Sequence, residues 1–298
     1  PKTQIVDGSP AQNCEFPSIV HLQIFNQPTD NMISLCGGTL IDSTHVLTAA
    51  HCLEGNVRRV KVNIGSNNKW SPGSQSTTAS RILKHGGYGH TPYLILTASI
   101  TDAAYIDDDN DGGGSGGDDD DDENNGQNDI AILTLSEPVR EGRCVKFAQL
   151  ARKGETFGTR RCIAAGWGDF QFKGNSPDEL YKVALPAIPH DVCTRRSSMR
   201  IADGVLCAGD FRQGGASTCQ GDSGGPLYCP SSNGQMVLAG VTSFGRNCDI
   251  EISTFSDVGY FRDWIESNLA SLHASSAKSL LLVVTDESQE PVHSSKTA

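Results

Sequence analysis

Hydrophobic positions along the chain gather in short runs that have the length of β-strands. The runs are rich in β-branched residues, and Gly, Asn, Asp or Pro lies between most of them, as is typical of strands joined by turns. Many short strands of this kind favour a β-sandwich or a β-barrel. The predicted strands are Ile19–Phe25, Arg59–Ile64, Ile130–Leu135, Arg161–Ala165 and Val237–Ser243.

One helix is predicted late in the chain, from Tyr260 to Leu272. Its apolar residues recur at spacings of three and four positions, which places them on one face of a helix. They are Phe261, Trp264, Ile265, Leu269 and Leu272. The longest aliphatic run, Leu280–Val284, is far shorter than the ~18 residues that a membrane-spanning helix needs. We therefore expect no membrane association.

Two segments lack the composition of a folded core. Residues 89–128 are rich in Asp and Gly, and residues 271–298 are polar apart from the aliphatic run. Eleven acidic residues lie between Asp102 and Glu123, so this segment accounts for the net charge of −11 and the rest of the chain is electrically balanced. Without a basic face, the chain is not expected to bind nucleic acid.

The ten cysteines are even in number and spread along the chain. This usage is typical of a secreted protein with about five disulfides. A zinc or redox protein is the alternative, but the sequence contains no C-x-x-C motif. We expect a secreted, extracellular protein.

Three short motifs carry residues that can act together in catalysis. They are TAAHC at 48–52, NDIAIL at 128–133 and GDSGGP at 221–226. A serine hydroxyl needs a base such as His to become a nucleophile, and the base needs a carboxylate to orient it and to stabilise its charged form. Glycines beside the serine permit a sharp turn whose N–H groups can stabilise an oxyanion. The motifs thus supply His51, Asp129 and Ser223 as a candidate catalytic triad.

On these motifs the sequence resembles the chymotrypsin/trypsin family of serine peptidases, over about Ile5 to Ala270. Further matches are IVDG at 5–8, CGGTL at 36–40, GWG at 166–168, LCAG at 206–209 and VTSFG at 241–245. The resemblance implies an all-β fold of two antiparallel six-stranded β-barrels with a C-terminal helix. Residues 5–140 would form barrel one with an insertion at 89–128, residues 141–260 barrel two, residues 260–272 the helix, and residues 271–298 a polar extension.

The resemblance also assigns roles. Ser223 would attack the scissile carbonyl, His51 would transfer the proton and Asp129 would orient His51. The backbone N–H groups of Gly221 and Ser223 would form the oxyanion hole, and Ser243 would brace Asp129. Residues 243–245 would pair with the substrate as an added strand, although Phe244 stands where the family usually has Trp.

The family pattern pairs eight of the ten cysteines. The implied disulfides are Cys36–Cys52, Cys162–Cys229, Cys193–Cys207 and Cys219–Cys248. The remaining two cysteines, Cys14 and Cys144, are expected to pair with each other.

Activation in the family frees the amino group of the residue that corresponds to Ile5, which then pairs with the residue that corresponds to Asp222. We therefore interpret residues 1–4, which begin with Pro1 rather than Met, as the remnant of a pro-segment and expect a zymogen. Gln4 stands where a basic residue is usual, so a trypsin-like activator is not expected to cut there.

The residues matching the specificity pocket are uncharged. Ser217 stands where trypsin-like members have Asp, Gly245 would leave the entrance open, and Ser253 and Phe255 would lie in the wall. This favours cleavage after Phe, Tyr, Leu or Met. An alternative alignment of the loop at 248–252 would bring Asp249 or Glu251 to the pocket and favour basic side chains.

The segment between His51 and Asp129 is much longer than the family needs, because of the acidic insertion. One hypothesis is a solvated loop without further function, and another is a loop that attracts basic protein substrates. A third is a calcium site, because alternating carboxylates suit Ca²⁺. Its candidate ligands are Asp107, Asp109, Asp111 and Asp118. No other metal or cofactor is expected.

The sequence therefore predicts a secreted serine endopeptidase that acts as a monomer on protein or peptide substrates and is open to protein inhibitors. The alternative is a catalytically silent homologue that binds another protein. A metal-dependent hydrolase has little support, because H-E-x-x-H is absent.

Overall fold

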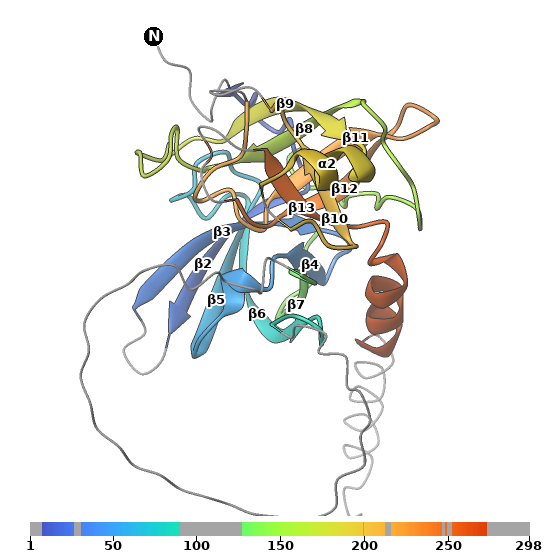
Figure 1. The fold of residues 1–298 in the computed structure, drawn as a ribbon. Helices are drawn as coiled ribbons and strands as arrows, with labels where there is room; N and C mark the ends of the chain where they lie inside the picture. Colours follow the sequence, from blue (N-terminus) through green and yellow to red (C-terminus); the bar gives the residue numbers. More distant parts are fainter. Residues whose placement is uncertain are drawn as a thin grey trace, which may run out of the picture.

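The computed structural model describes residues 8–26, 31–89, 127–198, 200–211, 216–245, 248 and 252–272. These residues form two β-barrels, one above the other in Figure 1, with a C-terminal helix beside the lower barrel. The predicted pro-segment and nearly all of the acidic insertion and of the C-terminal extension lie outside the described residues.

Barrel one is a closed ring of six strands in the order β2-β3-β4-β7-β6-β5. Their pairings are antiparallel. The strands are β2 (Ile19–Asn26), β3 (Met32–Leu40), β4 (His45–Thr48), β5 (Val57–Ile64), β6 (Gln75–Lys84) and β7 (Ala131–Leu135). Alternate residues of β2 and β5 fill the interior: Val20 lies opposite Ile64, and Leu22 lies opposite Val62. This alternation is what closes a sheet around a core.

Barrel two closes in the order β8-β9-β10-β13-β12-β11, because β8 also pairs with β9. Its strands are β8 (Arg161–Gly166), β9 (Tyr181–Ile188), β10 (Val205–Ala208), β11 (Pro226–Pro230), β12 (Met236–Thr242) and β13 (Ser253–Asp257). The short β1 (Ser9–Pro10) pairs with β9. The N-terminal part of the chain, assigned to barrel one from the sequence, is thus attached to barrel two.

The predicted two-barrel fold is confirmed, and each of the five predicted strands ends within two residues of the observed bounds. Besides the strands, the described residues include η1 (His51–Leu53), α2 (His190–Arg196) and a helix at 262–272. The last helix begins two residues later than predicted. The reason is that the Asp257 carboxylate accepts hydrogen bonds from the N–H groups of Gly259 and Tyr260, which forms a turn ahead of the helix.

The C-terminal helix follows barrel two in the sequence but packs against barrel one. Phe261, Ile265 and Leu272 are buried in the same hydrophobic cluster as the barrel-one strands. The His85 ring lies 5.3 Å from that of Phe261 and 5.1 Å from that of Trp264. The helix therefore ties the end of the chain to the first barrel.

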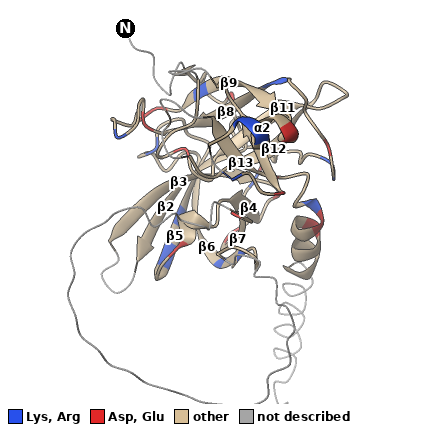
Figure 2. Cartoon of the chain, viewed as in Figure 1, with Lys and Arg blue, Asp and Glu red and all other residues tan. Residues whose placement is uncertain are grey.

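Five disulfides cross-link the fold; four are the pairs that the family resemblance implied, and the fifth joins the two cysteines that remained. They are Cys14–Cys144, Cys36–Cys52, Cys162–Cys229, Cys193–Cys207 and Cys219–Cys248. Acidic and basic residues are interspersed over both barrels in the described part of the chain (Figure 2). This distribution agrees with the charge balance expected outside the insertion.

Replacing Phe255 by Ala should lower the free energy of unfolding by about 3–5 kcal/mol, because the ring is fully buried and packs over Gly240 in barrel two. Denaturant unfolding in a Ser223→Ala background measures this without self-digestion. Met236→Ala, at an exposed position of the neighbouring β12, is the control and should change stability by less than about 0.5 kcal/mol. Equal effects of the two substitutions would contradict this account of the core.

Candidate active site

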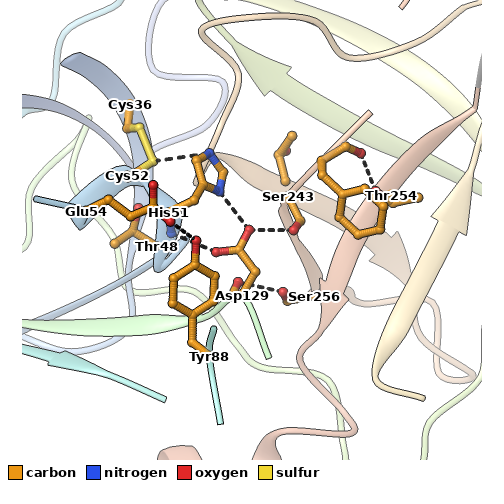
Figure 3. Close-up of polar contacts among 12 residues, drawn as sticks. Cys36, Thr48, His51, Cys52, Glu54, Tyr88, Asp129, Ser243, Thr254 and Ser256 are labelled. Carbon is orange, nitrogen blue, oxygen red and sulfur yellow. Dashed lines mark hydrogen bonds and ion pairs between the residues drawn. A yellow bond between two sulfur atoms is a disulfide. The ribbon is translucent and has the colours of Figure 1, made fainter. Parts of the chain in front are cut away.

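Asp129 lies buried where the two barrels meet, only 1% exposed. Its Oδ2 accepts hydrogen bonds from Nδ1 of His51 at 2.7 Å and from Oγ of Ser243 at 2.5 Å, and its Oδ1 accepts the backbone N–H of His51 at 2.8 Å (Figure 3). Ser256 Oγ donates to the Asp129 carbonyl at 2.6 Å. Because Ser243 and Ser256 belong to barrel two, this one carboxylate residue is held by both barrels.

His51 is the first residue of η1, which Ala49 and Ala50 connect to β4, and its orientation depends on Asp129. Burial alone would lower the pKa of His51, but the hydrogen bond and negative charge of Asp129 and the charge of Glu54 together raise it above the ordinary 6.5. With Nδ1 bonded to Asp129, Nε2 faces away from the carboxylate and lies 3.9 Å from Sγ of Cys52. The ring is thus oriented with Nε2 as its free proton acceptor.

Ser223 is presented by a tight loop that the backbone of both barrels holds. Its carbonyl accepts the N–H of Gly37 at 2.7 Å, and the N–H of Gly224 donates to the Thr242 carbonyl at 2.8 Å. A Cβ on Gly37 would lie 2.7 Å from the Gly225 Cα, so only glycine permits this approach of β3 to the loop. Ser223 lines the same cavity as His51, but within the described residues no hydrogen bond joins them. In unliganded sites such contacts often tighten only when substrate binds.

The loop also leaves two backbone donors available. Gly221 has a φ of +95°, a conformation that favours glycine. Among the described residues, the N–H groups of Gly221 and Ser223 have no acceptor. They are therefore free to bind a negatively charged oxygen.

Asp222 is a second buried carboxylate beside this loop. It accepts the N–H groups of Gly168 at 2.8 Å and Cys219 at 2.9 Å. Burial nevertheless raises its pKa to about 6, and the charge of Asp169 adds to the rise. No Lys or Arg of the described chain forms an ion pair with it, and Ile5, its expected partner, lies outside the described residues.

A cleft of about 360 Å³ runs past His51, Asp129 and Ser223. The predicted residues Ser243, Phe244, Gly245 and Ser253 line it, together with Thr218, Gln220 and Ile252, which the sequence did not single out. Glu54 and Tyr88 line its opposite part beside His51. Glu54 follows His51 by three residues, which is the only signal in the sequence that could have pointed to it.

Two predicted pocket residues lie elsewhere. Ser217 is buried and donates its hydroxyl to the carbonyl of Cys248, so it does not line the cleft. Phe255 lies two residues along β13 from Ser253, which places it about 7 Å deeper, in the core of barrel two. The wall is instead completed by Thr218, whose N–H donates to Oγ of Ser253 at 2.7 Å.

Several predicted residues cannot be placed. The calcium candidates Asp107, Asp109, Asp111 and Asp118, and the alternative pocket residues Asp249 and Glu251, lie outside the described residues. Within the part of the chain that is described, no three His, Cys, Asp or Glu side chains gather as a metal site. Nor does any helix there have the length and apolar character needed to cross a bilayer.

Two barrels that hold an Asp–His pair at their junction, beside a serine in a glycine-rich loop, define the class of two-barrel serine proteases. Comparison with known proteins leads to the same class. Residues 5–265 match the Trypsin family model. The chain belongs to this family and is a serine endopeptidase whose substrates are proteins.

Individual relatives cover most of the chain. Mouse kallikrein 1-related peptidase b3 is 32% identical over 79% of this chain and 80% of its own length. Human chymotrypsin-like elastase family member 3B is 30% identical over 91% of both chains. Trypsin eta of Drosophila erecta is 27% identical over 90% of this chain and 91% of its own length.

Replacing Asp129 by Asn should lower the pKa of His51, because the carboxylate supplies the hydrogen bond and charge that outweigh burial. NMR titration of the His51 ring in a Ser223→Ala background measures this value. A pKa that stays above 6.5 in the Asn variant would show that another group stabilises the imidazolium.

Proposed function

We propose that this endopeptidase cleaves peptide bonds through a catalytic triad of Ser223, His51 and Asp129. The 2.7 Å hydrogen bond between the buried Asp129 and His51, in a cleft that Ser223 also lines, is the observation that carries the proposal. It supports a histidine with a fixed tautomer and a basic Nε2, as a general base requires.

In the proposed reaction, Ser223 Oγ attacks the scissile carbonyl carbon while His51 Nε2 takes the serine proton. The C–N bond then breaks as His51 gives that proton to the leaving amine, which leaves an acyl-enzyme. Water attacks the ester, His51 takes a proton from the water and returns it to Ser223. The Asp129 carboxylate stabilises the imidazolium in both steps.

The N–H groups of Gly221 and Ser223 are proposed to bind the oxyanion of each tetrahedral intermediate. Their lack of acceptors among the described residues supports this role, since preorganised donors need no rearrangement as charge develops.

A preference for cleavage after uncharged residues such as Phe or Leu follows from the pocket wall. Gly245, Ile252, Ser253 and Thr218 carry no charge, so this wall offers a basic side chain no carboxylate. The same residues leave room for an apolar side chain, whose burial is favourable.

The chain is further proposed to be secreted as a zymogen and to act as a monomer that protein inhibitors can block. Five disulfides support an oxidising compartment. The buried Asp222, whose pKa is raised to about 6, would gain a counter-charge from a newly formed ammonium group at Ile5. Cleavage after Gln4 would thus further stabilise the loop that carries Gly221 and Ser223.

Cleavage after Gln4, followed by assay with peptides carrying Phe, Leu, Ala or Arg before the cut, tests the proposal. We expect turnover of the Phe and Leu peptides, loss of that turnover in Ser223→Ala, and labelling of Ser223 by a fluorophosphonate at one equivalent. Turnover of the Arg peptide alone would contradict the uncharged pocket. Absence of both turnover and label would favour a silent binding protein.

The pH dependence should follow His51. The base is active only when neutral and its pKa is raised, so kcat/KM should rise with pH through a value above 6.5 and be lost on acidification below it. A steady-state profile on a peptide without ionisable side chains measures this limb. A midpoint at or below 6.5 would refute the assigned effect of Asp129 and Glu54.

A further inference from the structure

Glu54 and Tyr88 form a polar pair in the cleft that the proposed chemistry does not use. The Tyr88 hydroxyl donates to Oε1 of Glu54, and both side chains line the cleft beside His51 (Figure 3). In Figure 3 they lie on the opposite side of Asp129 from Ser243. Glu54 directly follows η1, and its backbone N–H donates to the carbonyl of His51. Its carboxylate is therefore held in place from both its backbone and its side chain.

Glu54 has no Lys or Arg partner among the described residues of the cleft. Of the cleft-lining residues that the structure describes, Glu54 and Asp129 are the only acidic ones, and none is Lys or Arg. No Lys or Arg in the described ranges forms an ion pair with Glu54. The Glu54 side chain is exposed and lines the cleft, where its negative charge can attract a cation of the substrate.

An extended substrate would bring one particular side chain to this wall. If the peptide pairs with residues 243–245, the side chain before the cut enters the pocket at Thr218 and Ser253. Successive side chains of an extended strand point to opposite sides. The next side chain upstream therefore points away from the pocket, toward His51, Glu54 and Tyr88.

We propose that Glu54, held by Tyr88, selects Lys or Arg at the second residue upstream of the cleaved bond. The proposal rests on the proposed function and on the strand pairing of the substrate with residues 243–245 that the family resemblance implies. The preferred substrate then carries an uncharged residue directly before the cut and a basic residue before that one. Glu54 acts as a specificity-determining residue rather than as a participant in the bond-breaking steps.

The test uses peptides with Leu before the cut and Lys, Gln or Glu at the preceding position. We expect the activated wild-type enzyme to cleave the Lys peptide about three- to tenfold faster in kcat/KM than the Gln peptide, and the Glu peptide more slowly. Glu54→Gln should reduce the Lys preference to less than about twofold, and Tyr88→Phe should reduce it partly.

Added salt should weaken the preference in the wild type. Glu137→Gln, at an exposed position that does not line the cleft, is the matched control and should keep the preference.

Two readouts separate this proposal from its alternatives. Because Glu54 also raises the pKa of His51, Glu54→Gln could slow all three peptides equally, and that outcome would overturn the proposal. An unchanged Lys preference in Glu54→Gln would overturn it as well. Turnover of the Gln peptide shows that the proposed function holds even when the Lys preference is absent. Failure to cleave any of the peptides would overturn the proposed function and this proposal together.

Discussion

Burial of the Asp129 carboxylate at the junction of the barrels is the constraint on which the site depends. A buried charge is tolerated only when its oxygens are hydrogen-bonded, and here barrel one supplies His51 while barrel two supplies Ser243. The partners are therefore satisfied only when both barrels are folded and docked. This couples the orientation of His51 to the assembly of the whole domain.

The loop that carries Ser223 has a different source of order. Glycine contacts with β3 and the Cys219–Cys248 disulfide hold its ends, while Asp222 is buried with only backbone donors among the described residues. A carboxylate in that state has a raised pKa and is less stable in its charged form. A new counter-charge would therefore stabilise the charged form of Asp222 and with it the loop, far more than the barrels. Such an effect suits a switch that leaves the fold unchanged.

Among the described residues, the cleft combines an uncharged wall with one exposed carboxylate, that of Glu54. In the proposed function, Thr218, Ile252 and Ser253 would discriminate by size and polarity, whereas Glu54 would act over a longer range through its charge. Because successive side chains of an extended peptide point to opposite sides, the two would contact different residues of one substrate. Specificity in this protein would then depend on two neighbouring residues of the substrate rather than on one.

The sequence by itself determined the fold class, the strands and the residues of the proposed triad. Strand-length runs, the TAAHC and GDSGGP motifs and the cysteine spacing are local patterns, so they can be read without coordinates. The sequence could not decide the pocket wall, where Ser217 and Phe255 are buried and Thr218 lines the cleft. Nor could it pair Glu54 with Tyr88, since neither the depth along a barrel strand nor a contact between distant residues is set by local sequence. Only the closure and docking of the barrels bring such groups together.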